Sequence, residues 1–163
     1  MNTNVQIRKA IEADLEVITE IINHEILNAA VLYEYEPRAV KQQTEWFTEK
    51  QQHRWPIIVA ELNGCCRVRT YSLFRALPAF SKSIEHSVYT HQDHAEKAVD
   101  NLLMIELIRI AKSEGYHTMI AGIDSGNMSS IEFYRKFGFE VIGTFKEVGF
   151  KFDKESIPKS VSN

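Results

Sequence analysis

Two adjacent titratable side chains, Glu85 and His86, lie in a stretch whose pattern predicts a β-strand. A carboxylate among apolar neighbours has a raised pKa and can accept a proton near neutral pH, as a general base must. Neighbouring strand residues point to opposite faces, so we expect only one of the two to face a cleft. Glu85 shares its face with Ser87 and Tyr89. The alternatives are a structural salt bridge for Glu85 and a buried core position for His86.

Cysteine and histidine could also do chemistry, as metal ligands. The two cysteines, Cys65 and Cys66, are adjacent, so on a strand they point apart and can neither bind one metal nor form a disulfide framework. His91 and His94 are three apart around Asp93, but a zinc site needs further ligands at compatible spacing, and nothing nearby offers a thiol or a third imidazole. We therefore expect no metal site.

Strands and helices in alternation must position these side chains. Period-2 patterns predict strands over 5–9, 57–62, 65–74, 84–91, 117–123 and one or two within 140–152. Helical patterns cover 14–26, 40–52, 99–114 and 129–137. Asn63-Gly64 is a strong hairpin signal and Gly115 a C-cap. This order indicates an α/β fold, a mixed sheet with helices on both faces.

The expected helices have defined buried faces. Asp14 can cap or charge the first helix, whose apolar face carries Leu15, Ile18, Ile21, Ile22 and Ile26. In the second helix, Trp46 and Phe47 point inward. The helix over 99–114 buries Val99, Leu102, Leu103 and Ile110, with a polar stripe of Glu106, Arg109 and Ser113.

Composition limits the class of protein. The 163 residues are 44% hydrophobic and 25% charged, which predicts one globular domain, residues 1–152, before a polar tail, residues 153–163, that frays. A net charge of −3 gives no general attraction to nucleic acid. The chain contains no apolar run of the ~20 residues that a membrane helix needs and no signal-peptide core near its start. We expect a cytoplasmic protein with no nucleic-acid or membrane partner.

Several segments together resemble the GNAT superfamily of N-acetyltransferases. They are Ile84-Glu85-His86-Ser87-Val88-Tyr89, then a loop and a long helix, and Met119-Ile120-Ala121-Gly122-Ile123-Asp124-Ser125-Gly126-Asn127. Within the superfamily, the chain is similar to the phosphinothricin and methionine sulfoximine acetyltransferase group over about residues 5–152. The resemblance implies a GNAT fold, a mixed and mostly antiparallel sheet with a central splay and helices on both faces. It also implies acetyl-CoA as co-substrate and a homodimer.

The implied reaction moves an acetyl group from acetyl-CoA to the α-amine of a small amino-acid-like substrate by direct attack. Glu85 would assist deprotonation of the amine. No cysteine or serine is positioned with an adjacent base in a way that argues for a covalent acyl-enzyme. The alternative is a catalytically impaired, GNAT-like ligand-binding or dimeric interaction module.

That alternative depends on the loop that would bind pyrophosphate. The family pattern is Arg or Gln, two residues, then Gly-x-Gly or Gly-x-Ala, where glycine permits close backbone approach. This chain has instead Ala95, Glu96, Lys97, Ala98, Val99 and Asp100. Two acidic residues would lie beside the pyrophosphate, unless the segment is an ordinary acidic helix start. On the preceding strand, the resemblance implies pantetheine pairing with the backbone of Val88, Tyr89 and Thr90, the amide of Val88 polarising the thioester.

Five further residues complete the implied site. Asn127 matches a cofactor-contacting asparagine, although helix capping explains it equally well. Tyr134 matches a position near the departing sulfur, where a phenol can protonate the thiolate or merely pack. Arg75 could bind a substrate carboxylate, with Phe74 and Phe80 as pocket walls, or could be simply solvated.

The homodimer has a second basis in the segment 31–47. Tyr33, Tyr35, Trp46 and Phe47 are too many aromatic side chains for one small loop to bury alone. We therefore expect this segment to contribute to an interface.

Overall fold

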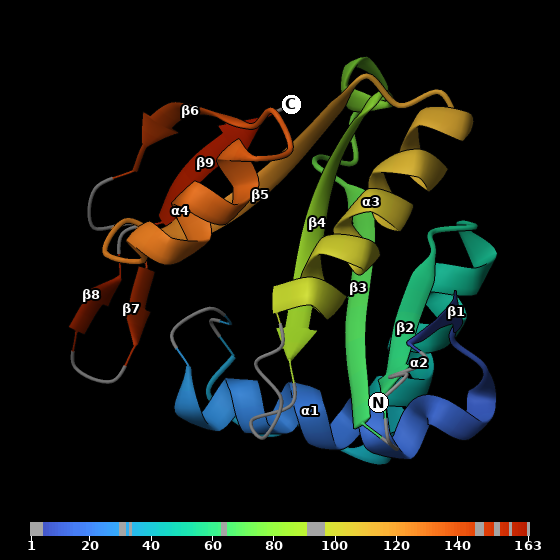
Figure 1. The fold of residues 1–163 in the computed structure, drawn as a ribbon. Helices are drawn as coiled ribbons and strands as arrows, with labels where there is room; N and C mark the ends of the chain where they lie inside the picture. Colours follow the sequence, from blue (N-terminus) through green and yellow to red (C-terminus); the bar gives the residue numbers. More distant parts are fainter. Residues whose placement is uncertain are drawn as a thin grey trace.

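A twisted sheet with a splayed centre carries four α-helices in the computed structural model of the chain (Figure 1). The structure describes residues 5–29, 32, 34–62, 65–90, 97–145, 149–151, 154–156 and 158–162. The helices are α1 (Leu15–Asn28), α2 (Val40–Gln52), α3 (Lys97–Ser113) and α4 (Met128–Arg135). The strands are β1 (Gln6–Lys9), β2 (Ile57–Leu62), β3 (Cys65–Leu73), β4 (Ser83–Thr90), β5 (Thr118–Asp124), β6 (Glu140–Thr144), β7 (Gly149–Lys151), β8 (Lys154–Ser156) and β9 (Pro158–Ser162).

The main sheet has the strand order β1-β2-β3-β4-β5-β9-β6, while β7 and β8 form a separate hairpin. Its pairs are antiparallel except for β4 and β5, which are parallel because α3 crosses over between them. The parallel pairing covers only Ser83–Glu85 against Thr118–Ile120. Beyond those residues the two strands separate, as Figure 1 shows. The expected mixed sheet with a central splay is therefore confirmed.

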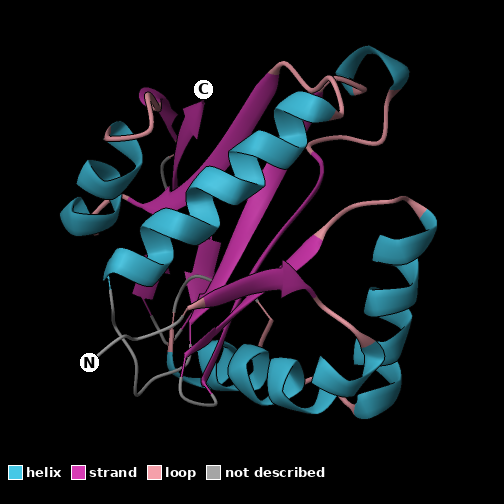
Figure 2. Ribbon diagram, turned by 45° about the vertical axis from the view of Figure 1, so that its right-hand side comes forward, coloured by secondary structure: helices cyan, strands magenta, loops and turns pink. Residues whose placement is uncertain are grey.

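Each face of the sheet has its own hydrophobic core. Strand residues alternate between the two, so Ile58 and Ala60 pack on the α3 side while Ile57 and Val59 pack on the α1 and α2 side. Figure 2 shows α3 crossing one face of the sheet. The predicted apolar face of α1 is confirmed, since its four core isoleucines are at most 1% exposed: Ile18, Ile21, Ile22 and Ile26.

Two sequence expectations about the helices need correction. Leu102 was expected inside, but it is 44% exposed, because the buried stripe of α3 runs through Leu103, Met104 and Leu107. Asp14 stands at the N-cap position of α1 but makes no capping hydrogen bond to it.

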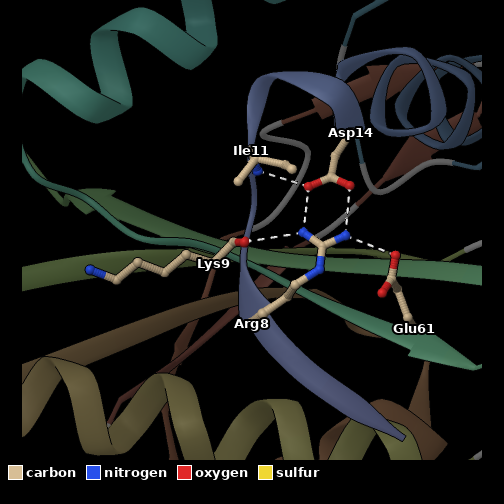
Figure 3. Close-up of polar contacts among 5 residues, drawn as sticks. All are labelled: Arg8, Lys9, Ile11, Asp14 and Glu61. Carbon is tan, nitrogen blue, oxygen red and sulfur yellow. Dashed lines mark hydrogen bonds and ion pairs between the residues drawn. The ribbon is translucent and has the colours of Figure 1, made fainter.

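Asp14 instead ties the helix start to the sheet (Figure 3). Arg8 on β1 donates to both of its carboxylate oxygens at 2.7 and 2.8 Å, and to Glu61 of β2 at 2.8 Å. The backbone N–H of Ile11 donates to the same carboxylate at 2.7 Å. The hydrogen bonds from Arg8 hold the pKa of Asp14 below its usual value. This cluster therefore holds β1, β2 and α1 together.

The expectation that the C-terminal residues fray is wrong for the described part of them. β9 pairs antiparallel with β5, Gly122 opposite Ser160, and with β6 on its other side. Backbone hydrogen bonds to a strand edge do not require an apolar sequence, so a serine-rich segment can fill this place. In the described part of the chain, no helix is long and apolar enough to cross a membrane.

Candidate active site

A cavity of about 290 Å³ lies beside the splay, between β4 and the helices α3 and α4. Its walls are Arg69, Val88, Thr90, Asp100, Asn101, Ser129, Ser130, Glu132, Phe133, Tyr134 and Lys136. Four of these were predicted site residues, from three different elements: Val88, Thr90, Asp100 and Tyr134. A larger, open hollow of about 490 Å³ on α2 contains none of the predicted site residues.

Glu85 lies where the pairing of β4 with β5 ends. Its side chain is exposed, and its Oε1 lies 3.6 Å from the position that a Cβ on Gly122 of β5 would take. The carboxylate is nevertheless partly desolvated by the surrounding residues, which raises its pKa. Among the described residues Glu85 has no ion-pair partner, so the structure gives no support to the salt-bridge alternative.

His86 points to the opposite face and is only 6% exposed. Its ring lies 5.1 Å from that of Tyr134 and 6.2 Å from that of Phe139. Burial, together with the charge of Arg69, lowers its pKa to about 3, so the imidazole is neutral at neutral pH. It is a core histidine, although neither ring nitrogen finds a hydrogen-bond partner among the described residues.

The structure places only some of the residues expected to bind acetyl-CoA on the cavity wall. Val88 and Thr90 line the cavity, whereas Tyr89 is buried in the α1 and α2 core, so only its backbone could contact a ligand in the cavity. Ala95 and Glu96 lie outside the described residues, and of Lys97 only the helical backbone is described. Ala98 is exposed and Val99 belongs to the core.

Asp100 does not stand as an isolated negative charge. Its carboxylate pairs with Arg67 at 2.5 Å and with Arg69 at 3.7 Å, and both arginines are buried on β3. This pairing revises the expectation that Asp100 opposes a bound pyrophosphate. The sequence reading missed both arginines. The signal was Arg67-Val68-Arg69, two charges on one face of a strand in which Val68, Thr70 and Tyr71 are also buried.

Asn127 and Tyr134 both belong to α4. The Oδ1 of Asn127 accepts from the backbone N–H of Ser130 and the hydroxyl of Ser129, each at 3.0 Å. Asn127 therefore caps the helix, as the alternative proposed, and it is not part of the cavity wall. Tyr134 is 5% exposed and lines the cavity. Burial raises the pKa of its phenol, while the charge of Arg69 and a hydrogen bond with it act in the opposite direction.

The three predicted substrate residues lie together. The rings of Phe74 and Phe80 are 5.9 Å apart, and the guanidinium of Arg75 lies 5.2 and 5.9 Å from their centres. The backbone N–H of Phe74 donates to the carbonyl of Ser83 at 3.0 Å, so Phe74 lies opposite Ser83. Ser83 is two residues from Glu85 on the same face of β4. The Arg75 group and the candidate base therefore share the α1 and α2 face.

Comparison with known proteins decides the family. The sequence matches the acetyltransferase (GNAT) domain over residues 7–156. The chain belongs to this family. This GNAT chain is 35% identical, over 92% of its length and 88% of the relative's, to the L-amino acid N-acyltransferase MnaT of Escherichia coli. It is 36% identical, over 91% and 87%, to the L-methionine sulfoximine/L-methionine sulfone acetyltransferase of Salmonella typhimurium.

A solved GNAT structure shows the same architecture with the donor bound. The phosphinothricin acetyltransferase of Sinorhizobium meliloti, in complex with acetyl-CoA, superimposes with a TM-score of 0.92 at 29% identity. The match covers 98% of this chain and 87% of that one. The predicted family and fold are thus confirmed, and the relatives are named acetyltransferases. His91, Asp93 and His94 lie outside the described residues, which contain no cluster of three or more potential metal ligands.

Proposed function

We propose that this GNAT protein is an N-acetyltransferase that moves the acetyl group of acetyl-CoA to the α-amine of a small amino-acid-like substrate. The observation that carries the proposal is the gap between β4 and β5, which has Glu85 at its closed end and the cavity on one face. The names of the relatives, for methionine sulfoximine, phosphinothricin and L-amino acids, support this substrate class. They give no support to the alternative of a non-catalytic module.

The residues present fit an extended thioester arm. From His86 to Thr90, β4 has no β5 partner, and the edge of a strand offers backbone donors and acceptors to an added segment. When bound, acetyl-CoA supplies the activated acyl group. The amide of Val88 would donate to the thioester carbonyl. Residues 95–100, which include the start of α3 at Lys97, would hold the pyrophosphate together with Asn127 and would contact the neighbouring part of the donor.

On the other face, Arg75 would bind the substrate carboxylate, with the rings of Phe74 and Phe80 beside it. Glu85 would accept a proton from the ammonium, directly or through water, and its raised pKa suits that task. Tyr134 would give a proton to the departing sulfur from the cavity side. Base and acid therefore act from opposite faces of the sheet, and the gap connects them.

The first test is steady-state acetylation of methionine sulfoximine and phosphinothricin by the Glu85→Gln variant. We expect kcat to fall by about 10²-fold with little change in KM, because only deprotonation is impaired. The wild-type rate should fall as the pH drops through the pKa of Glu85, at a pH above the usual glutamate value, and the variant should lose this acidic limb. Glu45→Gln, on the outer surface of α2, is the control. A variant with wild-type kcat and an unchanged limb would remove Glu85 as the base.

The second test addresses the acceptor. Arg75→Ala should mainly raise KM for the amino acid, by a loss on the order of 2–4 kcal/mol, because the substrate carboxylate loses its partner. Arg109→Ala removes an exposed arginine from α3 and should leave KM unchanged. Equal KM values for wild type and Arg75→Ala would place the carboxylate elsewhere. We further propose that the enzyme is a homodimer, as the sequence resemblance suggests, and that it is cytoplasmic, as its hydropathy pattern led us to expect.

A further inference from the structure

Arg69 is a charged side chain on the cavity wall that has no role in the reaction steps proposed above. It projects from β3, where it pairs with Val88 of β4, and only 2% of it is exposed. Its Nη1 lies 3.4 Å from the sulfur of Met104 on α3, and its Cζ lies 5.4 Å from the ring centre of Phe133 on α4. The guanidinium therefore bridges the two helices that enclose the cavity.

The hydrogen-bonding of Arg69 is incomplete. Its Nε has no hydrogen-bond partner among the described residues, and its carboxylate partner, Asp100, is 3.7 Å away and closer to Arg67. A buried guanidinium normally has its N–H groups paired, so an unpaired one on a cavity wall indicates a role with a ligand. The same guanidinium lines the cavity together with Tyr134, the candidate acid for the departing sulfur, and its charge acts on that phenol.

Resting on the proposed function, we infer that Arg69 stabilises the thiolate that leaves during acetyl transfer and positions Tyr134 to protonate it. A cation held in a desolvated site stabilises developing negative charge strongly, because little water screens it. Around the same cavity, Asp100 is paired with Arg67, His86 is neutral, and Glu132 and Lys136 lie exposed on α4 and at its end. Among these groups, Arg69 is the buried cation that shares the cavity wall with Tyr134.

The amine nitrogen forms a bond to the acyl carbon, and the C–S bond breaks with its electron pair on sulfur. Tyr134 gives its proton to that sulfur. Two protons leave the ammonium nitrogen in total, of which one reaches solvent through Glu85 and the other restores the phenol. Arg69 contributes charge and orientation and exchanges no proton.

The direct test measures the thiol of bound coenzyme A, without any turnover. Ultraviolet absorbance of the thiolate, followed against pH, gives the pKa of the thiol when it is bound to wild type, to Arg69→Met and to Arg69→Lys. Calorimetry shows in parallel that each protein binds coenzyme A. An opposite charge nearby should increase the thiolate-to-thiol ratio at least about 10-fold over free coenzyme A. Arg69→Met should lose this increase, and Arg69→Lys should keep part of it.

Rates with two donors separate a role at the sulfur from a structural role. Arg69→Met should transfer acetyl from acetyl-CoA about 10-fold or more slowly, but should lose much less with an S-acetyl nitroarylthiol, whose acidic thiol leaves unaided. Arg109→Met, the same change on the surface of α3, should affect neither rate. Asp100 keeps Arg67 as its ion-pair partner when Arg69 becomes methionine, so the change leaves no buried carboxylate without a cation.

The outcomes are distinct. If wild type binds coenzyme A and transfers acetyl but does not shift the bound thiol, the inference about Arg69 is overturned while the proposed function stands; this comparison needs no variant to fold. Equal losses of rate with both donors would also overturn it. If wild type neither binds coenzyme A nor transfers acetyl, the proposed function fails, and the inference with it.

Discussion

At the scale of single residues, the environment of a charge determines its chemistry more than its type does. Glu85 and His86 are neighbours, yet desolvation changes their pKa values in opposite directions. The pKa of the Glu85 carboxylate is raised, which favours proton acceptance, whereas the pKa of the His86 imidazole is lowered, so the ring stays neutral. Lys50 is a third case. Its ammonium donates to the carbonyl of Tyr71 at 2.9 Å and lies 5.7 and 5.3 Å from the rings of Trp46 and Trp55. Burial lowers the pKa of this amine to about 8.

This lowered pKa predicts how stability depends on pH. Between pH 8 and 10.5 the unfolded chain holds a proton that the folded protein has lost, so the free energy of unfolding should rise with pH there. The difference from 10.5 to about 8 corresponds to about 3 kcal/mol. Urea unfolding at a series of pH values should show this rise in wild type and in Lys41→Met, an exposed control, but not in Lys50→Met. If the free energy of unfolding changed with pH in the same way for wild type and Lys50→Met, the prediction would be wrong.

At the scale of elements, side-chain ion pairs hold the start of α3 where the family pattern has glycine. Asp100 in its first turn pairs with Arg67 and Arg69, so α3 is attached to β3 beside the cavity. A glycine would allow closer approach but would leave two buried guanidinium groups without this carboxylate. Ala98, two residues earlier, is exposed.

Restoring glycine at these two positions should therefore have unequal effects. Asp100→Gly should lower the free energy of unfolding by about 3 kcal/mol or more, the usual cost of removing one partner from a buried pair. Ala98→Gly should cost about 1 kcal/mol, because only helix propensity changes. Denaturant titration of the two variants measures the difference. Equal losses would show that the ion pairs do not hold α3.

At the scale of the whole molecule, the structure gives little support to the segment 31–47 as a dimer interface. Phe47 is 5% exposed and belongs to the core of the chain, and Trp46 is partly buried against the same core. Of the aromatic residues described in this segment, only Tyr35 is largely exposed, at 61%. Tyr33 lies outside the described residues. β6 ends the sheet order, with Ile142 60% and the following Phe145 55% exposed. An edge strand with exposed apolar side chains is prone to pair with another chain.

We predict a dimer that uses this edge. Sedimentation at micromolar concentration should give twice the chain mass for wild type and the chain mass for Ile142→Lys, since a buried lysine without a partner disfavours association. Leu102→Lys, on the exposed side of α3, is the matched control and should remain dimeric. A wild-type monomer would contradict the dimer, and a dimeric Ile142→Lys would place the interface elsewhere.

The sequence by itself determined what depends on neighbours along the chain. The periodicity of Val40–Gln52 and the apolar face of α1 were predicted correctly, because a helix places residues three and four apart on one face whatever lies beyond it. The family resemblance, not the periodicity, supplied Glu85 and Tyr134 as candidates for the chemistry, and their roles stay predictions.

Only the tertiary structure decided which distant groups meet. Asp100 and Arg67 are 33 positions apart, and neither residue shows in its own neighbourhood that the other neutralises it. The placement of β9 between β5 and β6 likewise depends on a strand edge left open elsewhere, not on the side chains of 158–162. Local periodicity specifies an element, but charge balance and strand pairing depend on what the fold brings within a few ångströms.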